Sequence, residues 1–463
     1  MDANRYLKEG EVLVKRHDRM ISAVNKALKE NAAFGKEMDV FQKTNLAVML
    51  ENVERDFDYR AQLNEATGVQ VGDVARKNDY LNLIAAVMPT LVAEEIVSVQ
   101  PLKQKAGVVF YMKHVYDSNK GLIKQGDNIS SFKQVGPDIE KYPASIEYSS
   151  EDVTDEAVVV SSQATKLSWT PVIAGSVNFT VGGAAYIDNG QGKIVKKDDS
   201  SEVGDIDYGT GEITNLTVTP TEVSYQLDLL TAPVNVPAVK TVVTDITVTA
   251  RPRKLKTGFS IDAAFDLMAT QNIDLQTVLQ ATATDEIRSE IDGEILQDLR
   301  NSGTTLQVSF NQPVPFGISK LQHYEAFYQT IVEGANKIYN KTRRITGNFV
   351  IVGENAANII ETHPKFKAAA SINEAGPHIM GTLGGRFLIV KNPYFGANDF
   401  VIGYKGDVVF DGGYVYAPYM PITATQFLMD ETFYGRQGFA TSYAKKLVAN
   451  EFFCQGLITQ ITE

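Results

Sequence analysis

Residues 274–301 read DLQTVLQATATDEIRSEIDGEILQDLRN and carry an apolar side chain at every fourth position. The stripe consists of Leu275, Leu279, Ala283, Ile287, Ile291, Ile295 and Leu299, and it is widened by Val278 and Leu296. Because this spacing stays close to the helical repeat, it predicts a helix about 40 Å long with Asp274 as its N-cap. A helix of this kind is typical of a spine laid across a sheet, or of a helix bundle.

Strands are predicted on both sides of this spine helix. Before it, Ala106–Tyr116 and Thr241–Ala250 are rich in β-branched and aromatic residues. After it, we expect a helix at Ser319–Tyr339, closed by the basic run Lys341–Arg344, and a buried strand at Asn348–Gly353. Further elements are a helix at Glu354–Thr362 and strands at Arg386–Val390, Phe400–Gly403, Asp407–Phe410, Val415–Tyr419, Phe439–Ala449 and Glu451–Ile461. This order indicates an α+β fold.

The first 60 residues are charged and helical in pattern. Apolar residues recur at helical spacing at Val12, Met20, Val24, Leu28, Val40, Leu46, Met49, Leu50 and Val53. This stripe is too narrow to form a core of its own, so the segment is interpreted as an arm that packs on something else. The polar stretch Asn64–Asp79 is interpreted as the linker that follows it.

Between the strands, residues 166–230 change to a β pattern. Thr, Val, Ile and Gly dominate, and turn signals such as Gly182-Gly183 and Asp188-Asn189-Gly190 recur along the segment. Strands spaced in this way predict a small all-β sandwich or barrel inserted into the chain.

Composition limits the classes of function. The chain has 463 residues and a net charge of −12, which disfavours direct wrapping of nucleic acid because an acidic surface repels phosphates. With the single cysteine Cys454, no disulfide can form within the chain. The N-terminus lacks the apolar region of a signal peptide, and no apolar stretch is long enough to cross a bilayer, so a soluble protein made inside a cell is expected.

Catalytic and metal-binding motifs are missing from the sequence. No phosphate loop or G-x-S-x-G elbow occurs, and His17, His114, His323, His363 and His378 show no metal-ligand spacing. We therefore predict no catalytic, cofactor-binding or metal residues, no cofactor, and no enzymatic activity.

Four other groups of residues have structural interpretations. Glu94-Glu95 is interpreted as a solvated helix face rather than a catalytic pair, and Asp188, Asp198 and Asp199 as turn residues rather than calcium ligands. Lys341, Arg343 and Arg344 are assigned to salt bridges or helix capping rather than to nucleic-acid binding. His363-Pro364 is interpreted as a helix stop.

Four blocks, in order, resemble the major capsid proteins of T4-like myophages. They are Met88–Leu102 (MPTLVAEEIVSVQPL), Thr247–Leu299 with Arg253-Lys254-Leu255-Lys256 before the spine helix, Ala335–Gly353 (ANKIYNKTRRITGNFVIVG) and Gly438–Asn450 (GFATSYAKKLVAN). No single block is specific for this family, but the occurrence of all four in the same order over residues 88–450 is specific for it.

The resemblance implies an HK97-like capsid fold with six parts. The expected parts are an N-terminal arm and linker (1–80), a peripheral domain with the spine helix (81–115 and 250–325), an extended β-hairpin loop (116–165 and 231–249), an inserted β domain (166–230), an axial domain (326–435), and C-terminal strands that return to the peripheral domain (436–463).

The function implied by the resemblance is self-assembly into the icosahedral head shell of a tailed bacteriophage. Expected partners are further copies in hexamers or pentamers, together with scaffold, portal, vertex and decoration proteins; packaged DNA is enclosed without specific binding, and no membrane is involved. The expected location is the virion capsid, with assembly in the host bacterial cytoplasm. Three alternatives stay open: the pentameric vertex paralogue, a carbohydrate- or surface-binding protein that acts through Trp169 or Tyr186 of the inserted domain, and an enzyme whose site is formed by residues far apart in the sequence.

The resemblance also implies one processing site. The family is commonly cut by a prohead protease after an [I/L]-x-E sequence, and Leu63-Asn64-Glu65, followed by Ala66, fits this pattern. Such a short sequence also arises by chance, so a cleaved arm and a retained arm both stay open, with the retained arm favoured.

Overall fold

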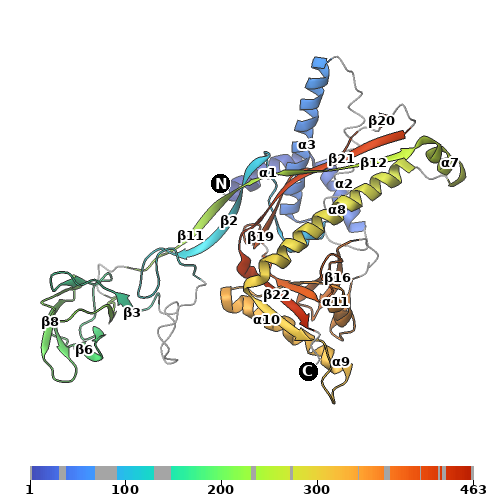
Figure 1. Ribbon diagram of the computed structural model, residues 1–463. Helices are drawn as coiled ribbons and strands as arrows, with labels where there is room; N and C mark the ends of the chain where they lie inside the picture. Colours follow the sequence, from blue (N-terminus) through green and yellow to red (C-terminus); the bar gives the residue numbers. More distant parts are fainter. Residues whose placement is uncertain are drawn as a thin grey trace. The chain divides into compact units, whose positions relative to one another are not determined.

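The computed structural model describes residues 3–30, 38–67, 91–129, 148–230, 236–271, 275–342, 344–369, 376–406, 408–425, 428–429 and 434–459 (Figure 1). The chain divides into two compact units. The first comprises residues 1–111, 245–340 and 345–463, and the second comprises residues 112–244 with 341–344. Both helices and sheets are present, which confirms the α+β prediction.

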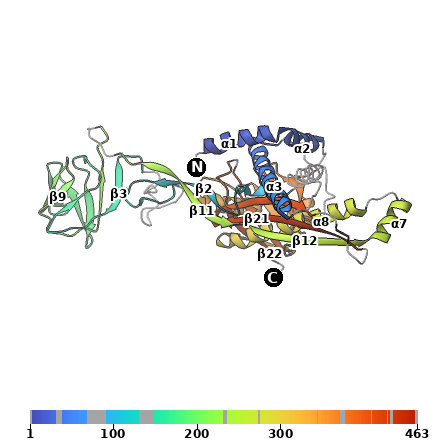
Figure 2. The same cartoon turned by 90° about the horizontal axis from the view of Figure 1, so that it is seen from above.

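The spine helix of the first unit is α8 (Leu275–Ser302), which contacts strands β12 and β21 (Figures 1 and 2). These strands belong to a sheet ordered β1 (Ser98–Val99), β19 (Tyr414–Ala424), β21 (Tyr434–Leu447), β12 (Arg251–Ser260), with β20 (Leu428–Met429) also paired to β21. Strand β12 continues directly into helix α7 (Ile261–Gln271).

The bounds of α8 agree with the prediction to within one residue at its end, whereas Asp274, the expected N-cap, lies outside the described residues. Ile287, Ile291, Ile295 and Leu299 are buried, but Val278 is 46% exposed. The predicted stripe therefore faces the core only over the later part of the helix.

A second sheet has seven strands and two faces covered by different cores. Its order is β13 (Gln307–Asn311), β22 (Phe453–Thr459), β18 (Asp399–Gly403), β14 (Phe349–Val352), β17 (Phe387–Lys391), β16 (His378–Leu383), β15 (Phe366–Ala368). Alternate residues of a strand point to opposite faces, so Val350 and Val352 join a core with α10 and α11 while Phe349 and Ile351 join the core of α8. Burial on both faces explains why the NFVIVG strand is apolar throughout.

Two predictions around this sheet were wrong in detail. The helix expected at Ser319–Tyr339 is two helices, α9 (Lys320–Glu325) and α10 (Phe327–Thr342), because the N–H of Ala326 bonds to the carbonyl of His323 and breaks the regular ladder. The strand expected at Asp407–Phe410 is a turn in residues 408–410, closed by the Asp411 N–H to Val408 O bond; residue 407 lies outside the described residues. Helix α11 (Glu354–Glu361) stops before Pro364 as predicted.

The N-terminal arm forms three helices, α1 (Ala3–Arg16), α2 (Asp18–Glu30) and α3 (Val40–Thr67). In both views α1 and α2 lie beside α3 (Figures 1 and 2). Residues 64–67 of the expected linker belong to α3, and residues 68–79 lie outside the described part of the chain. The description resumes at residue 91, and the first element there is the short helix α5 (Ala93–Ile96). Single turns of 3₁₀ helix occur at η2 (Gly303–Thr305) and η3 (Asn450–Phe452).

The second unit contains an eight-stranded antiparallel sheet with its own core, which includes Trp169, Phe179 and Ile213. Its order is β3 (Asp152–Ala157), β10 (Glu222–Gln226), β5 (Asn178–Val181), β6 (Ala184–Asp188), β7 (Lys193–Lys196), β8 (Glu202–Asp207), β9 (Glu212–Thr214), β4 (Thr165–Lys166). The sheet starts before residue 166 because β3 pairs with β10. Separately, β2 (Ala106–Tyr116) and β11 (Val239–Thr249) form a two-stranded ribbon.

Candidate assembly surface

Two asparagines of helix α3 fasten the arm to the main sheet of the first unit. The side-chain amide of Asn52 donates to the carbonyls of Leu102 and Tyr419 at 2.8 and 2.9 Å, and that of Asn45 donates to Val99 O at 3.4 Å. The two asparagines lie seven residues apart, which places them on one face of the helix. They supply donors to main-chain carbonyls at the point where the arm covers the sheet.

The same face of α3 is part of the core. Leu46, Met49, Leu50 and Val53 are buried in one cluster with Ile96, Tyr416 and the spine helix. Full burial of each such side chain contributes roughly 1.5–3 kcal/mol. The sequence predicts that the arm packs on another element without saying which one. The structure shows that it packs on the body of its own subunit.

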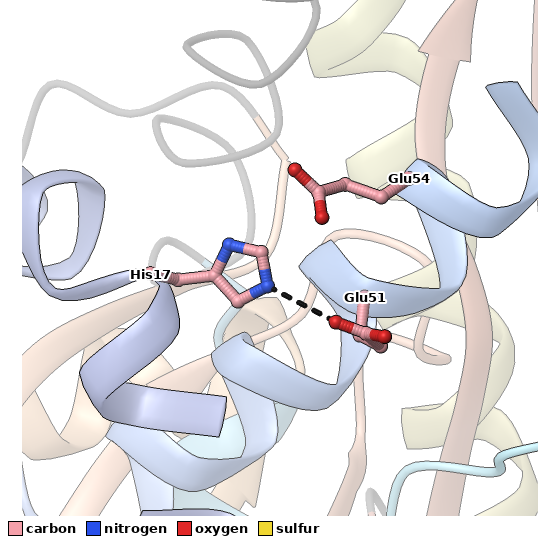
Figure 3. Close-up of side chains that lie close together, drawn as sticks. All are labelled: His17, Glu51 and Glu54. Carbon is pink, nitrogen blue, oxygen red and sulfur yellow. Dashed lines mark hydrogen bonds and ion pairs between the residues drawn. The ribbon is translucent and has the colours of Figure 1, made fainter. Parts of the chain in front are cut away.

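A charged clasp holds the junction of α1 and α2 against α3 (Figure 3). Both carboxylate oxygens of Glu51 accept hydrogen bonds from Arg16, at 2.8 and 2.9 Å, and His17 Nε2 lies 3.4 Å from Glu51. Burial by itself would raise the pKa of Glu51, but the bonds from Arg16 and His17 outweigh it, and the pKa is lowered. The clasp thus keeps Glu51 ionised and ties the helix junction to α3.

The clasp also contains a set of donor atoms that metals use. His17, Glu51 and Glu54 place one ligand atom each within 4.8 Å of one another, the one such grouping found in the described residues (Figure 3). However, the guanidinium of Arg16 already neutralises Glu51 through both of its oxygens. We therefore assign the cluster to holding the arm helices together.

A second charged network joins the spine helix to three strands. Arg253 of β12 pairs with Glu290 and Glu294, both at 2.5 Å, and Lys445 of β21 pairs with Glu294 at 2.7 Å and Asp298 at 2.6 Å. Tyr443 also donates to Glu294, and Tyr414 of β19 donates to Asp298 at 2.7 Å.

Glu294 is the centre of this network. Burial would raise its pKa, but the hydrogen bonds from Lys445, Tyr443 and Arg253 prevail and lower the pKa to about 2. Arg253, which stands in the R-K-L-K block, therefore has a structural role in fixing the spine helix on the sheet.

Glu94 does not lie on the solvated helix face that the sequence predicts. Its side chain is mostly buried, and desolvation raises its pKa to about 8, with Glu95 and Asp292 adding to the effect and Lys405 opposing it. The prediction of a solvated face is therefore wrong for Glu94. Its surroundings come from segments far apart in the chain, and no local sequence signal marks them.

Residues of the inserted sheet have structural roles. Asp188 is buried and accepts hydrogen bonds from Gly175 N, Gly190 N and the Tyr208 hydroxyl, which confirms its assignment to a turn. Trp169 is buried with its Nε1 bonded to Asn119 O at 2.8 Å, and Tyr186 stacks on Phe179 in the same core. Neither ring is available to stack on a sugar.

The expected protease site lies at the end of helix α3. Glu65 and Ala66 fall in its last turn, and the helix ends at Thr67. Cleavage at this bond stays a prediction. Of the basic run, Lys341 lies in the last turn of α10, and Arg343 lies outside the described residues.

The chain is similar in sequence to the major capsid proteins of several phages. A family model described as "Major capsid protein Gp23" matches residues 75–462. The major capsid protein of Enterobacteria phage T4 is 25% identical over 430 residues, covering 84% of this chain and 78% of that protein. That of Vibrio phage KVP40 is 25% identical over 420 residues, covering 82% and 78%.

Solved capsid structures show weaker likeness. The capsid of Myoviridae phage XM1 is 10% identical, with a TM-score of 0.33, and covers 50% of this chain and 81% of that one. The mature capsid of bacteriophage PhiM1 is 11% identical, with a TM-score of 0.34, and covers 51% and 80%. At these scores the likeness carries no weight, and the assignment rests on the sequence matches.

Among the helices of the described residues, none combines the length and the apolar character needed to cross a membrane. The predicted resemblance to T4-like capsid proteins is confirmed by the match over residues 75–462. The chain belongs to the Gp23 family of major capsid proteins, the structural subunits that form the head shell of a tailed phage virion.

Proposed function

We propose that copies of this chain tile the shell as hexamers, with the N-terminal arm retained as part of each subunit during assembly. Pentamers at the vertices are formed by the same chain or by a vertex paralogue. Assembly takes place in the host cytoplasm, with scaffold, portal and decoration proteins as further partners. The proposed role is structural and includes no catalysis.

The β2–β11 ribbon is the observation that carries this proposal. Most residues of β11 are exposed, among them Val239 at 58% and Val243 at 54%. A two-stranded ribbon is marginally stable alone in water. A neighbouring subunit that covers the ribbon would remove the exposed valines of β11 from water.

The net charge of −12 supports enclosure of DNA without specific binding, since the chain repels phosphates on average. The alternative of a sugar-binding protein loses its main support, because Trp169 and Tyr186 are buried. Processing after Glu65 is proposed as an optional step, and the intact mass of the subunit in mature particles would decide it.

The test is the assembly state of the purified full-length chain. Sedimentation velocity and negative-stain microscopy over a range of concentration and salt should show hexamers, shells or tubes. A monomer or small oligomer under every condition would contradict the proposal. Deleting Met1–Arg60 would not separate assembly from folding, because the deletion would expose Ile96 and Tyr416 of the core to water.

A further inference from the structure

The loop that leads from β13 into α9 exposes several apolar side chains close together (Figure 1). Phe316 is fully exposed, and Val314, Ile318 and Leu321 are also open to solvent. Residues 301–319 contain no charged side chain, although 22% of the whole chain is charged. An exposed aromatic residue in a segment depleted of charge is typical of the core of a protein–protein interface.

A tight turn shapes the tip of this loop. The N–H of Ile318 donates to the carbonyl of Pro315 at 3.3 Å, and Gly317 has a φ of +90°. A positive φ at the second central position is the mark of a type II turn, and glycine adopts it without strain. Pro313 and Pro315 fix their own φ angles on the approach to the turn. Residues 313–318, called the apolar loop below, therefore lose little conformational freedom when they bind.

A groove of about 570 Å³ runs along the outer face of α10. Its lining residues recur every three or four positions and so share one side of the helix, while Ile331 on the opposite side is buried. Apolar surface comes from Tyr328 and Val332, which also contact the core beneath. The other uncharged lining residues carry exposed amides: Gln329, Asn336 and Asn340.

The charged groups at this groove, called the α10 groove below, already have partners within the chain. Lys337 pairs with Glu333 at 2.8 Å and donates to the carbonyl of Gln307 at 2.9 Å. Lys365 lies beside the groove, with its ammonium 4.6 Å from the centre of the Tyr328 ring. An uncharged ligand adds no further charge to be desolvated, so it matches the groove better than an acidic peptide or a phosphate.

We propose that the apolar loop of one copy, with Phe316 at its tip, packs into the α10 groove of a second copy of this chain. The groove falls within the range of roughly 300–1,000 Å³ that is typical of ligand sites, so it has room for Phe316 and a neighbouring side chain. Amides of the groove supply donors and acceptors for the main chain of the loop. Covering Phe316 would remove a large apolar surface from water.

A second copy is the occupant because the chain belongs to a family of shell subunits and itself presents an apolar, uncharged loop. The loop and the groove are different surfaces of the first unit, so the contact is head-to-tail. Each copy then uses its loop on one neighbour and its groove on another, and contacts of this kind close into rings where the rotation permits. The inference rests on the proposed assembly into hexamers and names a contact for the ring.

One exposed residue of each surface, with a matched control, tests the contact. Phe316→Asp in the apolar loop and Asn336→Arg in the α10 groove should each reduce the assembly rate in light scattering by roughly tenfold or more. Val159→Asp, at an exposed valine of the second unit, and Asn301→Arg, at an exposed asparagine near the end of α8, should assemble like wild type. The circular dichroism spectrum and Tm of each variant at low concentration check its folding. If one surface variant misfolds, the other, on a separate element, decides the outcome.

Thiol cross-linking identifies the occupant. Particles are assembled from a mixture of Val314→Cys and Gln329→Cys chains, both of which retain Phe316, and are treated with a short bismaleimide; the native Cys454 is buried and does not compete. Cross-linked dimers with one chain of each kind should form in the mixture, and neither variant alone should give them.

Dimers from Val314→Cys alone would show a symmetric contact and overturn the inference. Mixed particles without cross-links would also overturn it, as would wild-type assembly of both surface variants or equal impairment of the controls. Failure of the wild-type chain to assemble would instead count against the proposed function.

Discussion

The side-chain amide of Asn52 donates to the main-chain carbonyl of Tyr419 at 2.9 Å, although the two residues are 367 positions apart in the chain. This bond joins the N-terminal arm to strand β19 near the centre of the first unit. Together with the bond to Leu102, it makes α3 a part of the folded subunit, since both carbonyls lie where the helix shields them from water.

Replacing Asn52 with Ala should lower the free energy of unfolding by roughly 2–4 kcal/mol, because two carbonyls lose their donor under the helix. Urea unfolding of the unassembled chain measures the change. Asn45→Ala is the matched control: its bond to Val99 is long at 3.4 Å, so its effect should be clearly smaller. Equal losses for the two variants would show that the amide bonds do not hold the arm.

Glu294 should make stability fall in acid. Its folded-state pKa of about 2 lies below the ordinary glutamate pKa of 4.5, so its contribution is present above about pH 4.5 and is lost as the pH falls towards 2. After allowance for solvent screening, the contribution is roughly 1–2 kcal/mol. Urea midpoints of wild type and Glu294→Gln should differ at pH 6, and the difference should shrink below pH 4.5 and close towards pH 2. A gap that is constant over this range would contradict the assignment.

Glu94 should make the folded state less stable in alkali, which is the opposite of the pH dependence expected from Glu294. Its folded-state pKa of about 8 lies above the ordinary glutamate pKa of 4.5, so the folded state holds a proton that the unfolded state loses. Stability therefore declines as the pH rises from about 4.5 to 8. The groups facing it are Lys405, Glu95, Asp292 and the buried Tyr416. Glu94→Gln should match wild type near pH 4.5 and exceed it at pH 9 by on the order of 3 kcal/mol. A variant that is less stable than wild type at pH 9 would show that the ionised carboxylate is needed.

The spine helix should be sensitive only where it faces the core. Ile295→Ala should cost about 2–5 kcal/mol, since the side chain is fully buried, whereas Val278→Ala on the same helix should change stability by less than about 0.5 kcal/mol. Thermal unfolding of the two variants gives the comparison. A large loss for Val278→Ala in the unassembled chain would mean that the start of α8 is covered by its own subunit.

Local patterns account for much of the fold. Strand β2 coincides with the predicted Ala106–Tyr116, because a run of β-branched and aromatic residues specifies a strand without outside help. The i+4 repeat likewise predicts α8. The division of α9 from α10 at Ala326 could not be foreseen, since no Pro or Gly marks it and the break depends on how Phe327 enters the core.

The assembly surface is less accessible to sequence reasoning. Asn45 and Asn52 stand seven residues apart within an apolar stripe, and this spacing was the available signal that the buried face of the arm needs donors. Their acceptors at Val99, Leu102 and Tyr419 come from distant segments, so the pairing emerges only from the tertiary fold. The burial of Glu94 depends in the same way on contacts with Asp292 and Lys405.

The docking of α3 has a consequence for any cut after Glu65. The arm is held by its packed face and by Asn52 as well as by the peptide chain, so breaking the Glu65–Ala66 bond would not release it at once. The cut would turn a tethered helix into a dissociable ligand, whose occupancy then follows its local concentration. Within a closed particle that concentration stays high, and after escape and dilution it vanishes. With the Glu65–Ala66 bond intact the arm cannot leave the subunit, and once the bond is cut the arm can dissociate slowly.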